Sequence, residues 1–371
     1  MEVRDVRRRA AAGASAKFPP PWADRLLGTK DLLAQASSLG LAIYVANQLS
    51  HLAEGGEVAD LCCGLGADSI GLAMAGHRVI GYDASRQAIL CAAHNARVAG
   101  VADRCRFEAA DVTQLSLSGE IAVHIDPARR AGGGRSISPA RYSPGAKFLR
   151  QLPTVTRTGA LKMSPAVDYH TLADWPHTQL EYISTGGVCR QLVLWWTQTP
   201  PADTAQPSRK ATVVFGEMTS PESISLPAGE ASAAPLGEVG RWLIEPDPAV
   251  IAAGATDDLS AFLARSGACR PWRIDPQLDW LFADNSPGQT PLARSYRILE
   301  VVAGRPGDVR RAVRALGGGV VAVKPRGVRL DTDRLQRQLR GPGKRCLTVL
   351  WGRVGLSQRA IIAEGEGPSA Q

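Results

Sequence analysis

The sequence lacks the features on which membrane, secreted and metal-binding proteins depend. No apolar run approaches the ~20 residues that a membrane helix needs. Residues 1–9 are basic, but small residues and prolines follow where a secretory signal needs an apolar core of ~7–15 residues. We therefore expect a cytoplasmic protein that does not bind membranes, and its 44% hydrophobic and 21% charged residues predict a globular one.

Cysteines are few and scattered. There are seven, an odd number, and no two of them form a CxxC pair. The adjacent Cys62 and Cys63 would point to opposite faces if they lie on a strand. This pattern argues against a disulfide framework and against a zinc site, so we expect no metal ion.

Positive charge is concentrated in one segment. The net charge is +8, yet residues 294–359 alone hold sixteen Lys and Arg residues against four acidic ones, so the rest of the chain is slightly acidic. Such clustering is typical of a module that binds a polyanion, nucleic acid above all. A genome that favours arginine would explain the excess of Arg over Lys but not the clustering.

From residue 56 onward, short apolar runs alternate with amphipathic segments. Strands of five to eight residues followed by helices of ten or more predict right-handed crossovers and a mostly parallel sheet covered on both faces. We expect the last two strands at 183–197 and 209–215, with an antiparallel hairpin as one arrangement of them. The predicted fold class is α/β, with a Rossmann-like, doubly wound sheet.

The remaining segments differ in composition from this core. A chain of 371 residues predicts two or three domains. Residues 1–21 combine an arginine run with prolines, which predicts a disordered tail, and residues 22–55 have the apolar spacing of two short helices. Residues 216–240 are rich in Pro, Gly, Ser and Ala, which predicts a linker or insert. Two small α+β units are expected at 241–293 and 294–362, and a tail at 363–371.

A glycine-containing turn is expected where the first strand of the sheet meets a helix. Residues 60–69 read DLCCGLGADS, and Gly64 and Gly66 allow a sharp turn and a close approach of the backbone to a ligand. Ligands of open α/β sheets bind at the carboxyl ends of the strands. The next strand ends in Asp83, whose carboxylate can accept hydrogen bonds from both hydroxyls of an adenosine ribose. The pattern predicts a nucleoside cofactor, either NAD or S-adenosylmethionine.

Two details favour S-adenosylmethionine. The dinucleotide fingerprint G-x-G-x-x-G needs a third glycine, and Ser69 stands in its place. The loop opens with Asp60, which would repel a pyrophosphate but suits a cationic amino acid. A third strand ends in Asp111, either a partner of the adenine amine or a helix N-cap. The residues expected to bind the cofactor are Asp60, Cys62, Gly64, Gly66, Asp68, Ser69, Asp83, Ala84, Asp111 and Val112.

A fourth strand ends in Asp126-Pro127, which we expect to be catalytic. The carboxylate and the Pro127 carbonyl can accept both hydrogens of an exocyclic amine and so orient its lone pair toward a methyl group. The alternative is that Asp126 only caps a turn. Arg129 and Arg130 could bind substrate phosphates or be solvated surface residues. Lys162 ends a further strand at the same rim and could contact substrate or pair with an acid.

Three arginines recur every third residue on a predicted helix of the basic segment. This spacing places Arg334, Arg337 and Arg340 on one stripe, which we expect to bind RNA phosphates. The alternative is that the stripe packs against the slightly acidic rest of the chain.

These motifs together resemble one family. The segments DLCCGLGADS, DPARR and KMSPAVD, with Asp83 between them and QASS before them, are similar to bacterial THUMP-like-domain methyltransferases related to the trimethylguanosine synthase, or RNA cap guanine-N2 methyltransferase, group. The resemblance covers residues 22–362. It implies a class I S-adenosylmethionine-dependent methyltransferase domain, a ferredoxin-like unit at 241–293 and an RNA-binding THUMP-like domain at 294–362.

The predicted function is methylation of a base in structured RNA, tRNA or rRNA, with an exocyclic amine as one candidate target. The cap-guanine relatives carry an aromatic residue directly after Asp-Pro-Pro, whereas this chain has Ala128-Arg129 there. Base stacking would then fall to Arg129, Tyr142 or Trp175, and guanine N2 as the target is in question. Two alternatives stay open: a methyltransferase of a small molecule or protein, and a non-catalytic RNA-binding protein that retains the fold.

Overall fold

The chain divides into two units, Met1–Ser225 and Leu226–Gln371. The computed structural model describes residues 17–20, 22–53, 56–117, 121–131, 134–135, 138–172, 178–197, 208–354 and 357–365. Most of the tail expected at 1–21 and the end of the tail expected at 363–371 lie outside these residues.

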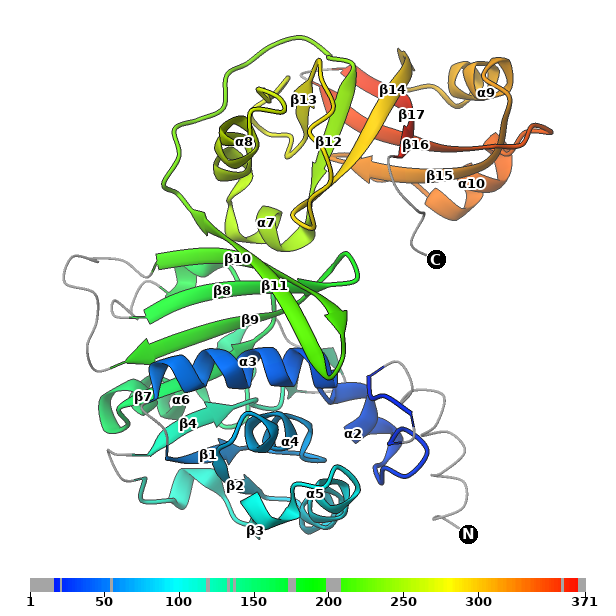
Figure 1. The fold of residues 1–371 in the computed structure, drawn as a ribbon. Helices are drawn as coiled ribbons and strands as arrows, with labels where there is room; N and C mark the ends of the chain where they lie inside the picture. Colours follow the sequence, from blue (N-terminus) through cyan, green and yellow to red (C-terminus); the bar gives the residue numbers. More distant parts are fainter. Residues whose placement is uncertain are drawn as a thin grey trace. The chain divides into compact units, whose positions relative to one another are not determined.

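The first unit is built on a nine-stranded sheet (Figure 1). Its strands are β1 (Glu57–Leu61), β2 (Arg78–Asp83), β3 (Cys105–Ala109), β4 (Ala122–Ile125), β7 (Thr158–Met163), β8 (Thr178–Thr185), β9 (Val188–Thr197), β10 (Ser208–Glu217) and β11 (Ser220–Ala228). They lie in the order β11-β10-β8-β9-β7-β4-β1-β2-β3. The neighbouring strands β7, β4, β1, β2 and β3 pair in parallel, and β9 runs antiparallel between β7 and β8. This confirms the mostly parallel sheet that the sequence predicts.

Helices pack on this sheet through two buried clusters. They are α2 (Lys30–Gln35), α3 (Leu39–Leu52), α4 (Ala67–Met74), α5 (Arg86–Val98) and α6 (Ala146–Val155). Leu49 of α3, Leu72 of α4 and Val193 of β9 belong to the first cluster. Leu33 of α2 and Ile70 of α4 belong to the second. The short pair α2 and α3 corresponds to the two helices expected between residues 22 and 55.

The last strands of this sheet differ from the expectation. The sequence suggests one strand over 183–197, but Gly186 and Gly187, with φ of 59° and 71°, turn the chain back and separate β8 from β9. Two successive residues with positive φ are what a two-residue hairpin turn of type I′ requires. β10 then pairs in parallel with β8, so the proposed hairpin of β9 with β10 is wrong.

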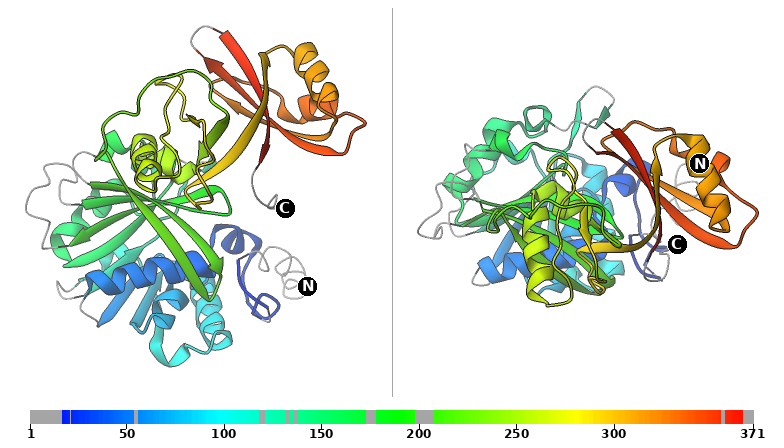
Figure 2. Two further views of the ribbon diagram at one scale, coloured as in Figure 1. Left: turned by 45° about the horizontal axis from the view of Figure 1, so that its top comes forward. Right: turned by 90° about the horizontal axis from the view of Figure 1, so that it is seen from above.

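The second unit is built on one six-stranded sheet in the order β13-β12-β14-β17-β16-β15. Its strands are β12 (Trp242–Pro246), β13 (Leu281–Ala283), β14 (Ala293–Ala303), β15 (Gly318–Arg326), β16 (Arg345–Val354) and β17 (Ser357–Gly365). Its helices are α7 (Pro248–Ala253), α8 (Thr256–Arg265), α9 (Pro306–Ala315) and α10 (Thr332–Leu339). Helices α9 and α10 lie side by side in both views of Figure 2 and share a buried core with β15, β16 and β17.

Three boundaries differ from those expected. β10 and β11 occupy much of the segment expected as a linker, so only residues 218–219 and 229–240 of it lie outside helices and strands. β12 pairs with β14, which joins the two small units expected at 241–293 and 294–362 in one sheet. β17 reaches Gly365 and so enters the expected tail. No helix within the described ranges is long and apolar enough to cross a membrane.

Candidate cofactor and reaction site

A cleft opens at the carboxyl ends of β1, β2 and β4. It has a volume of about 250 Å³, and its walls come from the loop after β1, the end of β2, the loop after β4 and helix α2. Open α/β sheets bind ligands at this edge. Of the residues predicted to bind the cofactor, four line the cleft: Cys62, Gly64, Asp68 and Asp83.

The loop after β1 has a backbone conformation that favours glycine. Gly64 and Gly66 have φ of 56° and 84°. A Cβ on Gly66 would lie only 3.0 Å from the Cβ of Ala92 on α5, so a side chain there would displace the helix. Cys62 also has a positive φ, 61°, although it is not glycine. It therefore holds about 1 kcal/mol or more of backbone strain in the wall of the cleft.

Asp83 at the end of β2 holds this loop and lines the cleft. Its Oδ2 accepts a hydrogen bond from the Gly64 amide at 3.0 Å, and its Oδ1 accepts one from the Ser85 amide at 2.8 Å. A carboxylate has about four acceptor positions, so two stay available for the hydroxyls of a ribose. A fixed double acceptor beside a glycine loop fits the adenosine part of a nucleoside cofactor.

Asp60 and Ser69 do not line the cleft, and their contact with the cofactor stays a prediction. Their exposed fractions are 1% and 0%. The Ser69 hydroxyl donates to Asp60, and Nδ1 of His124 lies 2.8 Å from the other carboxylate oxygen. Burial alone would lower the pKa of His124, but its hydrogen bond to Asp60 raises that pKa above the ordinary value. Asp60 thus ties β1 to β4 and α4, because its partners lie on those elements.

Ala84, Asp111 and Val112 are also outside the lining of the cleft. Asp111 caps a 3-10 helix, Val112–Gln114, by accepting hydrogen bonds from the amide and the hydroxyl of Thr113 at 2.9 and 2.8 Å. These bonds lower the pKa of Asp111. Val112 is buried and Ala84 is exposed. The capping alternative for Asp111 is therefore present, and contacts of the three residues with an adenine ring stay predictions.

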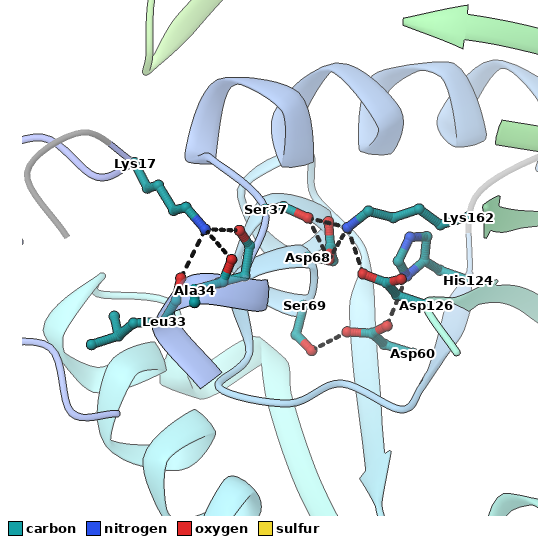
Figure 3. Close-up of polar contacts among 11 residues, drawn as sticks. Lys17, Leu33, Ala34, Ser37, Asp60, Asp68, Ser69, His124, Asp126 and Lys162 are labelled. Atoms are coloured by element: carbon teal, nitrogen blue, oxygen red, sulfur yellow. Dashed lines mark hydrogen bonds and ion pairs between the residues drawn. The ribbon is translucent and has the colours of Figure 1, made fainter. Parts of the chain in front are cut away.

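A buried lysine joins two carboxylates of the site (Figure 3). Nζ of Lys162 lies 2.6 Å from Oδ2 of Asp126 and 3.5 Å from Oδ2 of Asp68. Burial alone would lower the pKa of Lys162, which is 5% exposed, but the charges of Asp126 and Asp68 raise it above the ordinary value. Of the two roles considered for Lys162, the ion pair is the one that the structure contains. A direct contact of Lys162 with the substrate stays a prediction.

The turn between α2 and α3 belongs to the same cluster, and no local sequence pattern indicated its residues. Ser37 accepts a hydrogen bond from Lys162 and donates one to Oδ2 of Asp68 at 2.8 Å. The turn is fixed by Lys17, whose ammonium donates to three backbone carbonyls at the end of α2 (Figure 3). A cation is favourable there because the carbonyls of a helix end are unpaired and negative. The QASS segment, residues 35–38, pointed here only through the family resemblance.

The loop after Asp126 continues the wall of the cleft. Pro127 and Arg129 both line it, and Arg129 is half-buried. The side chain of Arg130 and all of Trp175 lie outside the described residues. Tyr142 is only 4% exposed, and its hydroxyl accepts a hydrogen bond from the Ser164 amide, so it cannot stack on a substrate base as one alternative required.

In the second unit, the predicted arginine stripe lies on the exposed side of α10. Leu335 and Leu339 turn into the core, whereas Arg334, Arg337 and Arg340 are exposed. None of these three arginines has an ion-pair partner among the residues described. The stripe is therefore available to a negatively charged ligand.

Other cations of the basic segment are already paired within the unit. Lys324 and Arg326 both contact Glu245, the latter at 3.1 Å. Arg345 pairs with Glu364 at 2.6 Å. Part of the basic excess therefore stabilises the fold rather than being free for a ligand.

Comparisons with known proteins agree with this geometry. The family described as RNA cap guanine-N2 methyltransferase matches residues 56–142, and the family described as THUMP domain-like matches residues 293–365. An uncharacterized S-adenosylmethionine-dependent methyltransferase of Mycobacterium tuberculosis (strain H37Rv) is 30% identical over 357 residues, which is 96% of this chain and 92% of that protein. The chain belongs to this family of S-adenosylmethionine-dependent methyltransferases.

Two further similarities concern the fold and a part of the methyltransferase. A putative methyltransferase from Porphyromonas gingivalis W83 has a crystal structure that matches with a TM-score of 0.73 at 16% identity, over 98% of this chain and 90% of that chain. Identity this low shows a shared fold alone. A 23S rRNA (uracil(1939)-C(5))-methyltransferase of Acidithiobacillus ferrooxidans is 38% identical over 63 residues, which is 17% of this chain and 14% of that protein.

The cofactor of the methyltransferase is S-adenosylmethionine, as the sequence predicts, and the cleft fits it. Asp83 and the backbone of the glycine loop would hold its adenosine part. When bound, the cofactor supplies an electrophilic methyl group. Asp126 and Pro127 stand on the wall of the same cleft, where they can orient a nucleophile. No group of three His, Cys, Asp or Glu residues in the described part of the chain could hold a metal ion.

Proposed function

We propose that the enzyme methylates an exocyclic amine of a base in structured RNA, tRNA or rRNA. The observation that carries the proposal is the position of Asp126 and Pro127 on the wall of the cofactor cleft, with Lys162 bound to one oxygen of Asp126. Because Oδ2 of Asp126 faces the ammonium group, Oδ1 is the oxygen left for the substrate. An RNA substrate would place the enzyme in the cytoplasm.

An amine needs orientation more than activation, because its nitrogen already has a lone pair. Oδ1 of Asp126 and the carbonyl of Pro127 would accept the two amine hydrogens and so direct the lone pair at the methyl group. Lys162 pairs with Oδ2 of the Asp126 carboxylate, and a carboxylate only accepts hydrogen bonds. The nitrogen–carbon bond forms as the sulfur–carbon bond breaks, and the nitrogen then loses a proton to solvent.

A ring carbon such as C5 of uracil is less consistent with this cleft. Methylation at such a carbon needs a nucleophile that first adds to the ring. Burial raises the thiol pKa of Cys62 and of Cys63, the two cysteines in the wall of the cleft. Both thiols are therefore neutral and weak nucleophiles.

RNA is favoured over a protein or a small molecule by the second unit. The unpaired arginines of α10 present positive charge along one exposed helix face, which suits a row of phosphates. The match to the THUMP domain-like family covers this part of the chain. We propose that residues 293–365 bind the RNA whose base reaches the cleft of the first unit.

The proposal is tested by following methyl transfer to separate substrate classes. The purified enzyme is incubated with tritiated S-adenosylmethionine and with RNA, protein or small-molecule fractions from a strain that lacks the gene. We expect label in the RNA fraction alone, and none when Asp126→Ala replaces the wild type. Label in the protein or small-molecule fraction would overturn the proposal.

A further inference from the structure

A second hollow, which we call the β9–β10 groove, adjoins the cofactor cleft in the first unit. It has a volume of about 700 Å³ and is lined by the turn between α2 and α3, the first residues of β9 and the last residues of β10. The groove and the cleft share Gln35, Ala36 and Arg129 as lining residues, so they are continuous. A hollow of this size is within the range of about 300–1,000 Å³ typical of ligand sites.

The groove contains one nearly buried polar side chain, Gln191. Gln191 lines the groove with an exposed fraction of only 2%, and its amide makes no hydrogen bond to any residue that the structure describes. The strand register places Gln191 close to the reaction site. Lys162 on β7 lies opposite Val193 on β9, and Gln191 precedes Val193 by two residues, so the two β9 side chains point to the same face of the sheet. The amide is open to the hollow rather than sealed in the core, so it can donate to and accept from a ligand there.

Two cations and an exposed aromatic residue complete the lining. Arg129, where the groove meets the cleft, and Arg190, beside Gln191, have no ion-pair partner within the described ranges. Phe215 near the end of β10 is 37% exposed and lines the same groove. An amide that can donate and accept, a ring face and two free guanidinium groups are what a single RNA strand needs for its base edge, its base face and its phosphates.

We propose that the β9–β10 groove binds the RNA nucleotide next to the target nucleotide, with the Gln191 amide on its base edge. The inference rests on the proposed RNA substrate. Phe215 packs against the base, and Arg129 and Arg190 contact the flanking phosphates. The target base enters the cleft beside Asp126 while its neighbour occupies the groove, so the groove determines which sequence context is methylated.

The first test replaces Gln191 with leucine, which has nearly the same volume and no polar group. RNA from a strain that lacks the gene is the substrate. Losing the hydrogen bonds should raise the KM for RNA by about three- to tenfold, while kcat and the affinity for S-adenosylhomocysteine stay unchanged. Stability should not fall, because the variant removes no hydrogen bond to a residue that the structure describes. A loss of stability with an unchanged KM would mean that Gln191 is only structural, and the proposal would be wrong.

The second test separates the groove from non-specific charge. Arg190→Glu and Phe215→Ala should each raise the KM for the same RNA, whereas Arg97→Glu, an exposed arginine on α5, should not. Equal effects of Arg190→Glu and Arg97→Glu on the KM would mean that the arginines attract RNA only through their charge, and the groove proposal would be wrong. If all variants methylate RNA like the wild type, the groove proposal fails and the RNA substrate stands. If the wild type transfers no methyl group to RNA, the proposed function itself fails.

Discussion

Lys162 in the first unit and the arginine stripe in the second hold positive charge in opposite ways. Lys162 of the first unit is buried and touches two carboxylates. Arg334, Arg337 and Arg340 of the second unit are exposed and have no ion-pair partner in the described part of the chain. A buried pair has fixed geometry and little screening by salt, whereas exposed cations act through an attraction that salt weakens. We therefore assign orientation of the reacting amine to the first unit and attraction of the RNA to the second.

Removing Asp126 should have the largest effect on catalysis. Asp126→Ala is expected to lower kcat by about a hundredfold or more, because a misplaced nucleophile costs that much. Calorimetry should show unchanged binding of S-adenosylhomocysteine, since Asp83 and the glycine loop are intact. Asp103→Ala, an exposed aspartate beside β3, is the matched control and should behave like the wild type. Near-normal turnover by Asp126→Ala would leave Asp126 as a turn residue only.

Removing Lys162 should harm both stability and activity. Lys162→Met leaves Asp126 and Asp68 without their cation, and urea unfolding should show a loss of about 3 kcal/mol. This value is the low end of the free-energy loss typical of a broken buried ion pair, because the side chain of Asp126 is 20% exposed. The same change on the surface, Lys147→Met on α6, should cost far less. Equal stability of the two variants would show that the ion pair is not part of the fold's support.

The same pair should make stability depend on alkaline pH. The pKa of Lys162 in the folded protein lies above its ordinary value of 10.5. The stability that its charge contributes is therefore complete below pH 10.5 and is lost only as pH rises through the higher folded value. The difference in unfolding free energy between the wild type and Lys162→Met should stay constant from pH 7 to about pH 10. A difference that already declines near pH 8 would contradict the raised pKa.

Reversing the stripe on α10 should change salt dependence rather than chemistry. The triple variant Arg334→Glu, Arg337→Glu, Arg340→Glu should make the log–log slope of RNA affinity against salt shallower by about 2, at about 0.7 per phosphate. Affinity for S-adenosylhomocysteine should not change. The control is Arg265→Glu, which reverses the charge of an exposed arginine at the end of α8. An unchanged slope in the triple variant would remove the stripe from the RNA-binding surface.

The smallest expected effect is at Cys62, where charge plays no part. Cys62→Gly relieves the positive φ and should stabilise the protein by less than about 1 kcal/mol, because the greater freedom of glycine in the unfolded chain offsets part of the gain. Thermal unfolding measures it. A clear loss of stability would mean that the thiol makes contacts worth more than the strain it causes.

The sequence predicted the elements with strong periodicity and missed those defined by pairing. β1, α4, β2 and α5 follow from alternating apolar runs and from glycines at their junctions. The turn at Gly186–Gly187 was a readable hairpin signal, but the apolar run around it suggested one long strand. β17 was missed because its place depends on pairing with β14 and β16, which no local pattern records.

The site was predictable in kind but not in its contacts. Asp83 and Asp126 stand at strand ends, where the fold class places functional groups. The partner of Lys162 could not be chosen from the sequence, since Ser37 lies 125 residues away and Asp68 lies 94 residues away. The partner of Asp60 could not be chosen either, because a carboxylate at the start of a ligand loop looks the same in sequence whether it faces the cleft or, as here, His124.

The central claim is that the Asp126–Lys162 pair orients an RNA amine for methylation. The most direct measurement is mass spectrometry of nucleosides from RNA of a strain lacking the gene, after incubation with S-adenosylmethionine and either the wild-type enzyme or Asp126→Ala. We predict one new nucleoside, methylated on an exocyclic nitrogen, with the wild type and none with the variant. A methyl group on a ring carbon or on the ribose, or the same product from Asp126→Ala, would contradict the claim.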